Sequence, residues 1–194
     1  MLFGSPEVRA QMNAYMRDVL RLAGKLGARP LVFGSPKNRL KGDLPDDQAM
    51  EIAADFFSTL AETAAQENVI LCVEPNPVEY ACDFVRTTAP AIELVKRVNH
   101  PHFRLHLDSA IMTMNGEAIE SALESAADYL AHFHVSEPQL GVVGEGTVDH
   151  ARFAAALRAI HYQGWVAIEM RGGWKNPDLD AVKTALSYTL EVYS

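Results

Sequence analysis

Four side chains of the types that bind metal ions recur along the sequence at intervals of about one strand–helix unit. They are Glu74, Asp108, His134 and Glu169, and the intervals between them are 34, 26 and 35 residues. A parallel βα unit takes roughly 30 residues, so the four positions fall in phase with such a repeat. Glu74 follows the apolar run ILCV, Asp108 follows FRLHL, His134 lies in AHFHV and Glu169 follows WVAI. Each therefore stands at or near the carboxyl end of an expected strand.

This set of side chains suits one divalent cation. Parallel strands place their carboxyl ends at the same edge of a sheet, and in a barrel those ends converge on one mouth. Three carboxylates close together would repel one another and raise each other's pKa values, a conflict that a bound dication removes. Mixed oxygen and nitrogen ligands without a thiolate fit Mn, Mg, Co or Zn, and Mn is the first choice. Taken singly, a carboxylate after a strand is often a helix N-cap, and a histidine in an apolar strand is often a core residue.

The segments around these positions alternate between strand and helix patterns. We expect strands at residues 31–33, 69–73, 103–107, 130–135 and 165–168. The strand at 69–73 is a continuous apolar run without polar alternation, which predicts a parallel sheet buried on both faces. We expect helices that begin near Ser5, Asp46, Thr88, Asn115, Asp149 and Asn176, the last with Val182, Leu186 and Leu190 on its buried side. No GxGxxG follows a strand, so a dinucleotide-binding sheet is disfavoured against a β/α barrel.

The predicted fold class is therefore α/β, a TIM-type parallel barrel that is incomplete. About five strands and six helices are expected in one domain over residues 1–194, corresponding to strands 4 to 8 of an eight-stranded barrel. A closed barrel typically has about 250 residues, so we expect strands one to three to be absent from this chain. Apolar interior surface and two unpaired sheet edges would then be exposed, which predicts a homo-oligomer.

Composition narrows the classes of function. The chain of 194 residues is 48% hydrophobic and carries a formal charge of −8, which argues against a nucleic-acid partner. Only two cysteines occur, and Cys72 in its apolar run is expected to be a small buried side chain. No apolar run approaches the roughly 18 residues of a membrane helix, and the first residues lack a signal-peptide pattern. A cytoplasmic protein without a membrane partner is the expectation.

Several strings along the whole chain carry a resemblance to a known family. LVFGSPKNR, VEPNP, LHLDSA, HFHVSEP, GEGTVDH and GWVAIEM are similar, in the same order, to motifs of the sugar phosphate isomerase/epimerase family. That family belongs to the xylose-isomerase-like TIM barrels. The resemblance implies that the four metal-binding candidates are the ligands of a divalent metal.

The resemblance also implies roles in catalysis. Glu74 and Glu169 would form the acid/base pair, one removing a proton alpha to a carbonyl and the other returning one, through an enediolate. Three further side chains would line the substrate pocket: His132, Glu137 and Asn76. The substrate class implied is a small sugar or sugar phosphate.

The chain departs from the epimerase pattern in two places. Where the epimerases carry a His three residues after the aspartate ligand, this chain has Ile111, and where they carry an Arg after the histidine ligand it reads QLG at 139–141. Glu145 and Arg171 are candidates for polar contacts, although solvent-facing loop positions suit them equally. Lys37 and Arg39 could bind an anion, but we expect them to be solvated on the surface.

Three readings of function follow. The leading one is a divalent-metal-dependent sugar or sugar phosphate isomerase or epimerase. A second is a metal-dependent dehydratase, a lyase acting on a keto-polyol by the same proton abstraction. A third is a non-catalytic truncated barrel that is stable only as an oligomer. Metal content and turnover on a substrate panel separate them.

Overall fold

A computed structural model describes residues 1–173 and 178–194 of the chain. Two compact units make up the described chain, Met1–His106 and Leu107–Ser194. The boundary falls inside the strand Phe103–Asp108.

All five predicted strands are present. They are β1 (Pro30–Phe33), β2 (Ile70–Val73), β3 (Phe103–Asp108), β4 (Leu130–Ser136) and β5 (Val166–Glu169). The strands follow one another in the sheet in chain order, and the pairs β1–β2, β2–β3 and β4–β5 are parallel. Pro30 opens the edge strand β1, a position where a missing backbone N–H costs no ladder hydrogen bond. The helix after every strand but the last leads into the next parallel strand, as in a β/α barrel that has five of its eight units.

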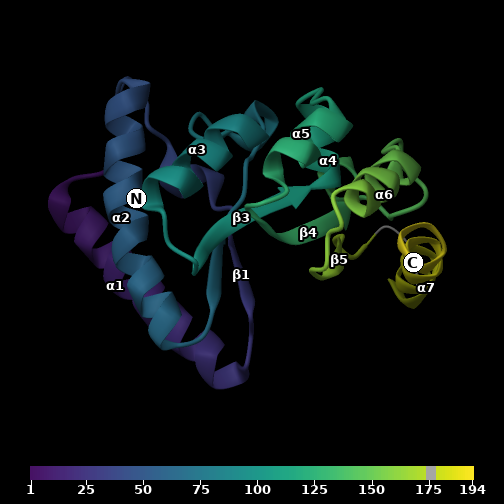
Figure 1. The fold of residues 1–194 in the computed structure, drawn as a ribbon, viewed down its shortest axis with the longest axis horizontal. Helices are drawn as coiled ribbons and strands as arrows, with labels where there is room; N and C mark the ends of the chain where they lie inside the picture. The colour runs from purple at the N-terminus through teal and green to yellow at the C-terminus, as the bar shows by residue number, and fades with distance from the viewer. Residues whose placement is uncertain (174–177) are drawn as a thin grey trace. The chain divides into compact units, whose positions relative to one another are not determined.

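Three α-helices belong to the N-terminal unit: α1 (Pro6–Leu26), α2 (Asp46–Gln66) and α3 (Thr88–Val98). The predicted start of α1 is confirmed, because the Ser5 side chain accepts a hydrogen bond from the Val8 amide at 3.4 Å. α2 lies beside both α1 and α3 (Figure 1). The short 3-10 turns η1 (Pro36–Arg39) and η2 (Val78–Tyr80) follow β1 and β2.

Aromatic side chains join the helices of this unit to its strands. The ring of Phe57 on α2 lies 5.2 Å from that of Phe33 on β1 and 4.7 Å from that of Phe103 on β3. Cys72 on β2 is fully buried, and burial raises the pKa of its thiol to about 12. It is therefore an inert core residue, as its apolar run predicts.

Within residues 107–173 and 178–194, the described part of the C-terminal unit, the α-helices are α4 (Ser109–Met114), α5 (Ile119–Ala126), α6 (His150–Ala159) and α7 (Asp178–Tyr193). The predicted cap of α6 is confirmed, since the Asp149 side chain accepts from the Arg152 amide at 3.1 Å. The predicted cap at Asn115 is wrong, because Asn115 ends α4 and α5 begins after Ala118. The sequence reading missed α4, a helix of six residues that starts directly at the end of β3. The short turn η3 (Pro138–Leu140) follows β4.

The predicted buried face of α7 is also wrong. Val182, Leu186 and Leu190 are 47%, 49% and 59% exposed. The buried positions are the smaller residues Ala181, Ala185 and Thr189, one helical turn apart. Small side chains on this face allow α7 to approach its neighbours α6 and β5. The expected start at 176–177 lies outside the described residues, and the helix is described from Asp178.

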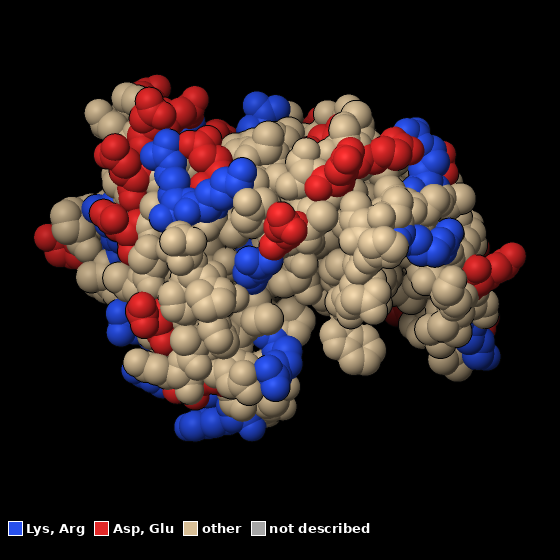
Figure 2. Space-filling model, viewed as in Figure 1, with Lys and Arg blue, Asp and Glu red and all other residues tan. Residues whose placement is uncertain are grey.

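Charge on the visible face is mixed. Acidic side chains gather over the start of α2, with basic side chains among them (Figure 2). Two ion pairs occur there, Lys41 with Asp46 at 3.1 Å and Arg97 with Asp47 at 3.9 Å. Among the described residues, every helix is too short or too polar to cross a membrane.

Candidate metal and active site

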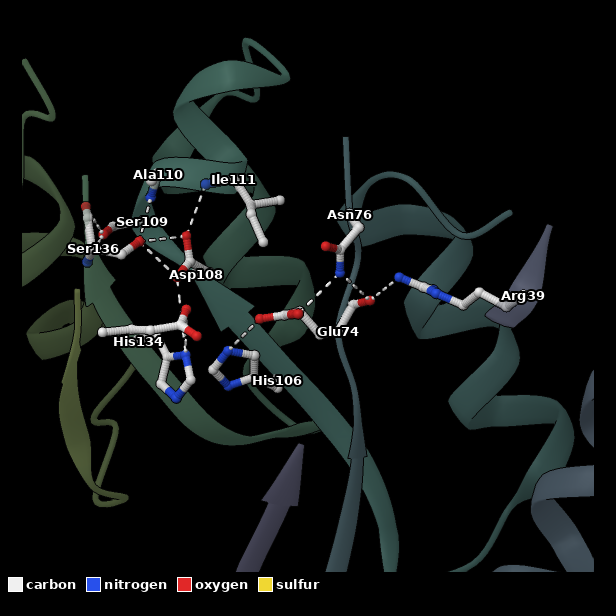
Figure 3. A network of polar contacts seen from close by, with 11 residues as sticks. Arg39, Glu74, Asn76, His106, Asp108, Ser109, Ala110, Ile111, His134 and Ser136 are labelled. Carbon is white, nitrogen blue, oxygen red and sulfur yellow. Dashed lines mark hydrogen bonds and ion pairs between the residues drawn. The ribbon is translucent and has the colours of Figure 1, made fainter. Parts of the chain in front are cut away.

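Glu74 stands one residue beyond β2, where two polar side chains hold its carboxylate (Figure 3). Asn76 Nδ2 donates to Glu74 Oε2 at 2.9 Å, and Nε2 of His106 lies 3.2 Å from Oε1. The β2–β3 register explains the second contact, because Val73 pairs with Leu105 and the next residues therefore lie side by side. The orientation of Glu74 is thus set from both of its oxygens.

A close approach to β1 adds a third constraint on Glu74. The Glu74 amide donates to the Phe33 carbonyl at 3.2 Å. A Cβ atom on the following residue, Gly34, would lie only 2.4 Å from Glu74 Oε2. Gly34 in the FGSP string is therefore needed so that the carboxylate can lie against the end of β1.

Arg39 is buried beside the backbone of Glu74, so the expectation that it is solvated is wrong. Its side chain is 1% exposed, with Nη2 donating to the Glu74 carbonyl at 2.6 Å and Nη1 to the Val85 carbonyl at 3.4 Å (Figure 3). Burial lowers the pKa of Arg39, and the nearby Cys82, Glu74 and Asp83 oppose that shift. The guanidinium thereby fixes both ends of the loop that carries Glu74 and Asn76.

Asp108 ends β3 and is held by backbone and hydroxyl donors (Figure 3). The Ile111 amide donates to Asp108 Oδ1 at 2.8 Å, so Asp108 is the N-cap of α4. Ser136 Oγ lies 2.6 Å from both carboxylate oxygens, although its single proton can serve only one at a time. Ser109 and Ser136 also exchange two hydrogen bonds, at 2.9 and 3.0 Å. Asp108 is therefore fixed, and it is a helix cap as well as a ligand candidate.

His134 lies between two carboxylates of the C-terminal unit. Its Nδ1 is 3.2 Å from Glu169 Oε2 and 4.0 Å from Asp108 Oδ2. The β4–β5 register accounts for the contact between His134 and Glu169. Ser136 pairs with Glu169, so Glu169 lies just beyond His134. Asp108 is 2% exposed, His134 16% and Glu169 42%, so the group opens outward at Glu169.

The chemistry of this group fits a divalent cation. One imidazole nitrogen and two carboxylates, from the ends of three successive strands, offer mixed nitrogen and oxygen donors. The Ser136 hydroxyl and the Ile111 amide hold Asp108 from behind, which is how outer hydrogen bonds orient metal ligands.

The sequence-predicted residues fall into three places. Glu74 and Asn76 lie together in the N-terminal unit, whereas Asp108, His134 and Glu169 lie together in the C-terminal unit. His132 is buried beside His134, with ring centroids 5.0 Å apart. Glu137 lies in a separate hydrogen-bond network with the loop after β4.

Sequence reasoning missed His106 and Ser136, although a signal for both was present. Side chains two residues apart on a strand share a face of the sheet. His106 therefore shares a face with Asp108, and Ser136 shares one with His134 and His132. Arg39 had no such signal, because its burial depends on the path of the loop after β2.

The chain belongs to the family described as the xylose isomerase-like TIM barrel, which it matches over residues 3–191. Among curated proteins it is similar to the L-ribulose 3-epimerase of Methylomonas sp. (strain DH-1), with 30% identity over 124 residues. That match covers 64% of this chain and 42% of the relative. The D-psicose 3-epimerase of Ruminiclostridium cellulolyticum is 26% identical over 175 residues, covering 84% of this chain and 57% of the relative. The chain thus spans about half the length of the curated relatives it matches.

Solved structures share the fold. D-psicose 3-epimerase from Clostridium cellulolyticum H10, solved with D-tagatose, has a TM-score of 0.84 at 21% identity. That comparison covers 98% of this chain and 73% of the other. The IOLI protein, solved with a binding zinc atom, has a TM-score of 0.79 at 19% identity, covering 98% of this chain and 72% of the other. The predicted family and fold class are confirmed.

Proposed function

We propose that this chain is part of a divalent-metal-dependent sugar isomerase or epimerase, with Glu74, Asp108, His134 and Glu169 as the ligands of one cation. The observation that carries the proposal is the placement of His134 Nδ1 within 4.0 Å of carboxylate oxygens of both Asp108 and Glu169. Glu74 is added because it stands at the same end of its strand and in phase with the others. Family membership and the 3-epimerase relatives support the reaction class.

The reaction proposed is removal of a proton alpha to a carbonyl, followed by its return to the opposite face. A divalent cation would supply positive charge that stabilises the oxyanion of the enediolate. Glu74 and Glu169 are the acid/base pair in this proposal. Asn76 and His106 hold Glu74 from both of its oxygens, so the base is oriented before substrate binds. The more exposed Glu169 is the partner that can reach a ligand from solvent.

The substrate class proposed is a small ketose or its phosphate, with His132, Asn76 and Glu137 near it. The similar curated proteins include an L-ribulose 3-epimerase and a D-psicose 3-epimerase, and both of these sugars are ketoses. Mn is the proposed metal among Mn, Mg, Co and Zn, because the ligands are mainly carboxylates.

Metal content by mass spectrometry and proton exchange test this proposal. The wild type is compared with Glu169→Gln, which removes one ligand charge, and with Glu124→Gln, an exposed glutamate on α5 as the matched control. We expect about one divalent metal per chain in the wild type and control, and much less in Glu169→Gln. In D₂O, the metal-loaded chain should introduce deuterium beside the carbonyl of D-psicose, D-tagatose or L-ribulose.

Two results would overturn the assignment. Equal metal content in all three proteins, or none in any, would exclude the ligand set. Deuterium exchange that ends in loss of a hydroxyl would replace the epimerase with a dehydratase of the same site.

A further inference from the structure

A small cavity lies at the carboxyl end of β4, within the C-terminal unit. It has a volume of about 320 Å³ and is lined by Glu137, Pro138 and residues 141–142 and 145–147. We call residues 141–148 the β4 loop. Its first lining residue, Glu137, follows three residues after His134, a proposed metal ligand. The conformation of this loop therefore shapes the surroundings of His134.

Glu137 is the buried anchor of the β4 loop. Glu137 is 2% exposed. Oε2 accepts hydrogen bonds from the amides of Thr147 at 3.0 Å and Val148 at 3.2 Å, and Oε1 lies 3.0 Å from Nε2 of His150. Three of roughly four acceptor sites of the carboxylate are therefore used within the protein. This carboxylate shapes the cavity wall and has little capacity left for a ligand.

His150 links that anchor to the last helix. The imidazole is 1% exposed, and its second nitrogen, Nδ1, lies 2.9 Å from the hydroxyl of Tyr193 at the end of α7. The ring of Tyr193 also lies near those of His150 and Phe133, with centroids 5.9 and 6.5 Å away. A continuous chain of hydrogen bonds thus runs from the β4 loop through α6 to α7.

The GEG string of the loop fits this arrangement. A Cβ atom at Gly146 would lie 2.0 Å from Glu137 Oε2. Only glycine lets the backbone pass so close to the carboxylate. The close approach places the next two amides within hydrogen-bond distance of the same oxygen.

The protonation state of Glu137 determines the direction of its hydrogen bond with His150. Burial raises the pKa of Glu137, but hydrogen bonds from His150, Val148 and Thr147 outweigh it, so the pKa lies below its ordinary value. Burial also raises the pKa of Tyr193, which keeps its phenol neutral. His150 must therefore donate from Nε2 to the carboxylate, while the phenol can donate to Nδ1 or accept from it.

We propose that Glu137, His150 and Tyr193 are positioning residues, a buried hydrogen-bond chain that fixes the β4 loop as a cavity wall with the end of α7 as its outer anchor. Loss of the Tyr193 hydroxyl leaves His150 with one fixed partner instead of two. The imidazole can then rotate, the Glu137 carboxylate loses its orientation, and the loop amides lose their acceptor.

Amide exchange and ¹⁵N spectroscopy of the full chain test this proposal without metal or substrate, so the result is independent of the proposed function. The variants are Tyr193→Phe and Glu137→Gln, and Tyr15→Phe on α1 is the control because Tyr15 is 68% exposed. We expect the amides of Thr147 and Val148 to exchange about tenfold faster in both variants, the effect of losing roughly one hydrogen bond. The ring ¹⁵N shift of His150 Nδ1 should change in Tyr193→Phe and not in the control.

Two outcomes would overturn the proposal. Loop amides that exchange as slowly in both variants as in the wild type would show that the chain does not hold the loop. If the exchange rate of a core amide such as that of Val135 rose by the same factor, the variants would have loosened the fold in general, and the hydrogen-bond chain would not be a local anchor.

Discussion

Two buried residues of opposite charge, Arg39 and Glu137, have the same structural role. Each bonds to backbone groups of a loop that follows a strand: Arg39 donates to two carbonyls and Glu137 accepts from two amides. Removing one partner of such a set leaves the other groups buried without a hydrogen bond, which costs more than the bond itself gains. Substitution of either residue should therefore lower the stability of the fold more than substitution of an exposed charged residue would.

Arg39→Met should destabilise the protein by about 2–4 kcal/mol, because the Glu74 and Val85 carbonyls would lose their buried donor. Urea unfolding followed by circular dichroism measures the difference. Arg29→Met is the control, since the Arg29 contact to Asn68 is exposed, and it should change stability by less than about 0.5 kcal/mol. Equal losses in the two variants would contradict the role assigned to Arg39.

The contribution of Glu137 should depend on pH. Its pKa is lower in the folded protein than the ordinary value of 4.5, so the stabilisation is present above that value and is lost as pH falls through the folded pKa. The urea midpoint of the wild type should therefore exceed that of Glu137→Gln at pH 7, and the gap should narrow in acid below pH 4.5. A gap that stays constant from neutral to acid pH would contradict the prediction.

At the scale of elements, the sequence analysis was wrong about the helices α7 and α4. Hydrophobic periodicity on α7 favoured the leucine face as the buried face, but the protein buries the alanine face. The short α4 has no periodicity to detect, and its start depends on Asp108 capping the Ile111 amide. The neighbours of α7 decided its buried face, whereas α4 begins at a local cap and is too short to show a period.

Ala185→Leu tests the corrected face of α7. Ala185 is fully buried, so added methylenes have no space and should cost about 1–3 kcal/mol. Leu186→Ala on the next position is the matched control, because Leu186 is 49% exposed and its truncation should cost well under 1 kcal/mol. Thermal unfolding gives both values. A greater loss in Leu186→Ala would restore the original prediction.

At the scale of the whole molecule, apolar side chains remain exposed on two helices. On α7 they are Leu179, Val182, Leu186 and Leu190, and on α1 they are Val8, Tyr15, Leu22 and Leu26. β1 and β5 are the edge strands of the sheet. Exposed apolar side chains and open sheet edges favour association with further protein surface.

We therefore expect this chain to self-associate at micromolar concentration. The double variant Leu186→Glu, Leu190→Glu places charge on the exposed face of α7 and should lower the average mass in light scattering without loss of helix content. Ser187→Glu on the same helix is the control for added charge alone. A wild type that is already a clean monomer would refute the expectation.

The sequence alone determined the five strands, most helix starts, the fold class and the spacing of Glu74, Asp108, His134 and Glu169, because these depend on local periodicity and on the βα repeat. Tertiary structure decided what depends on distant segments: the burial of Arg39 and the buried face of α7. It also decided that Glu137 binds loop amides and His150, residues that lie 10 to 13 positions further along the chain. Hydrogen bonds of that range leave no period in the sequence, so only the folded chain shows them.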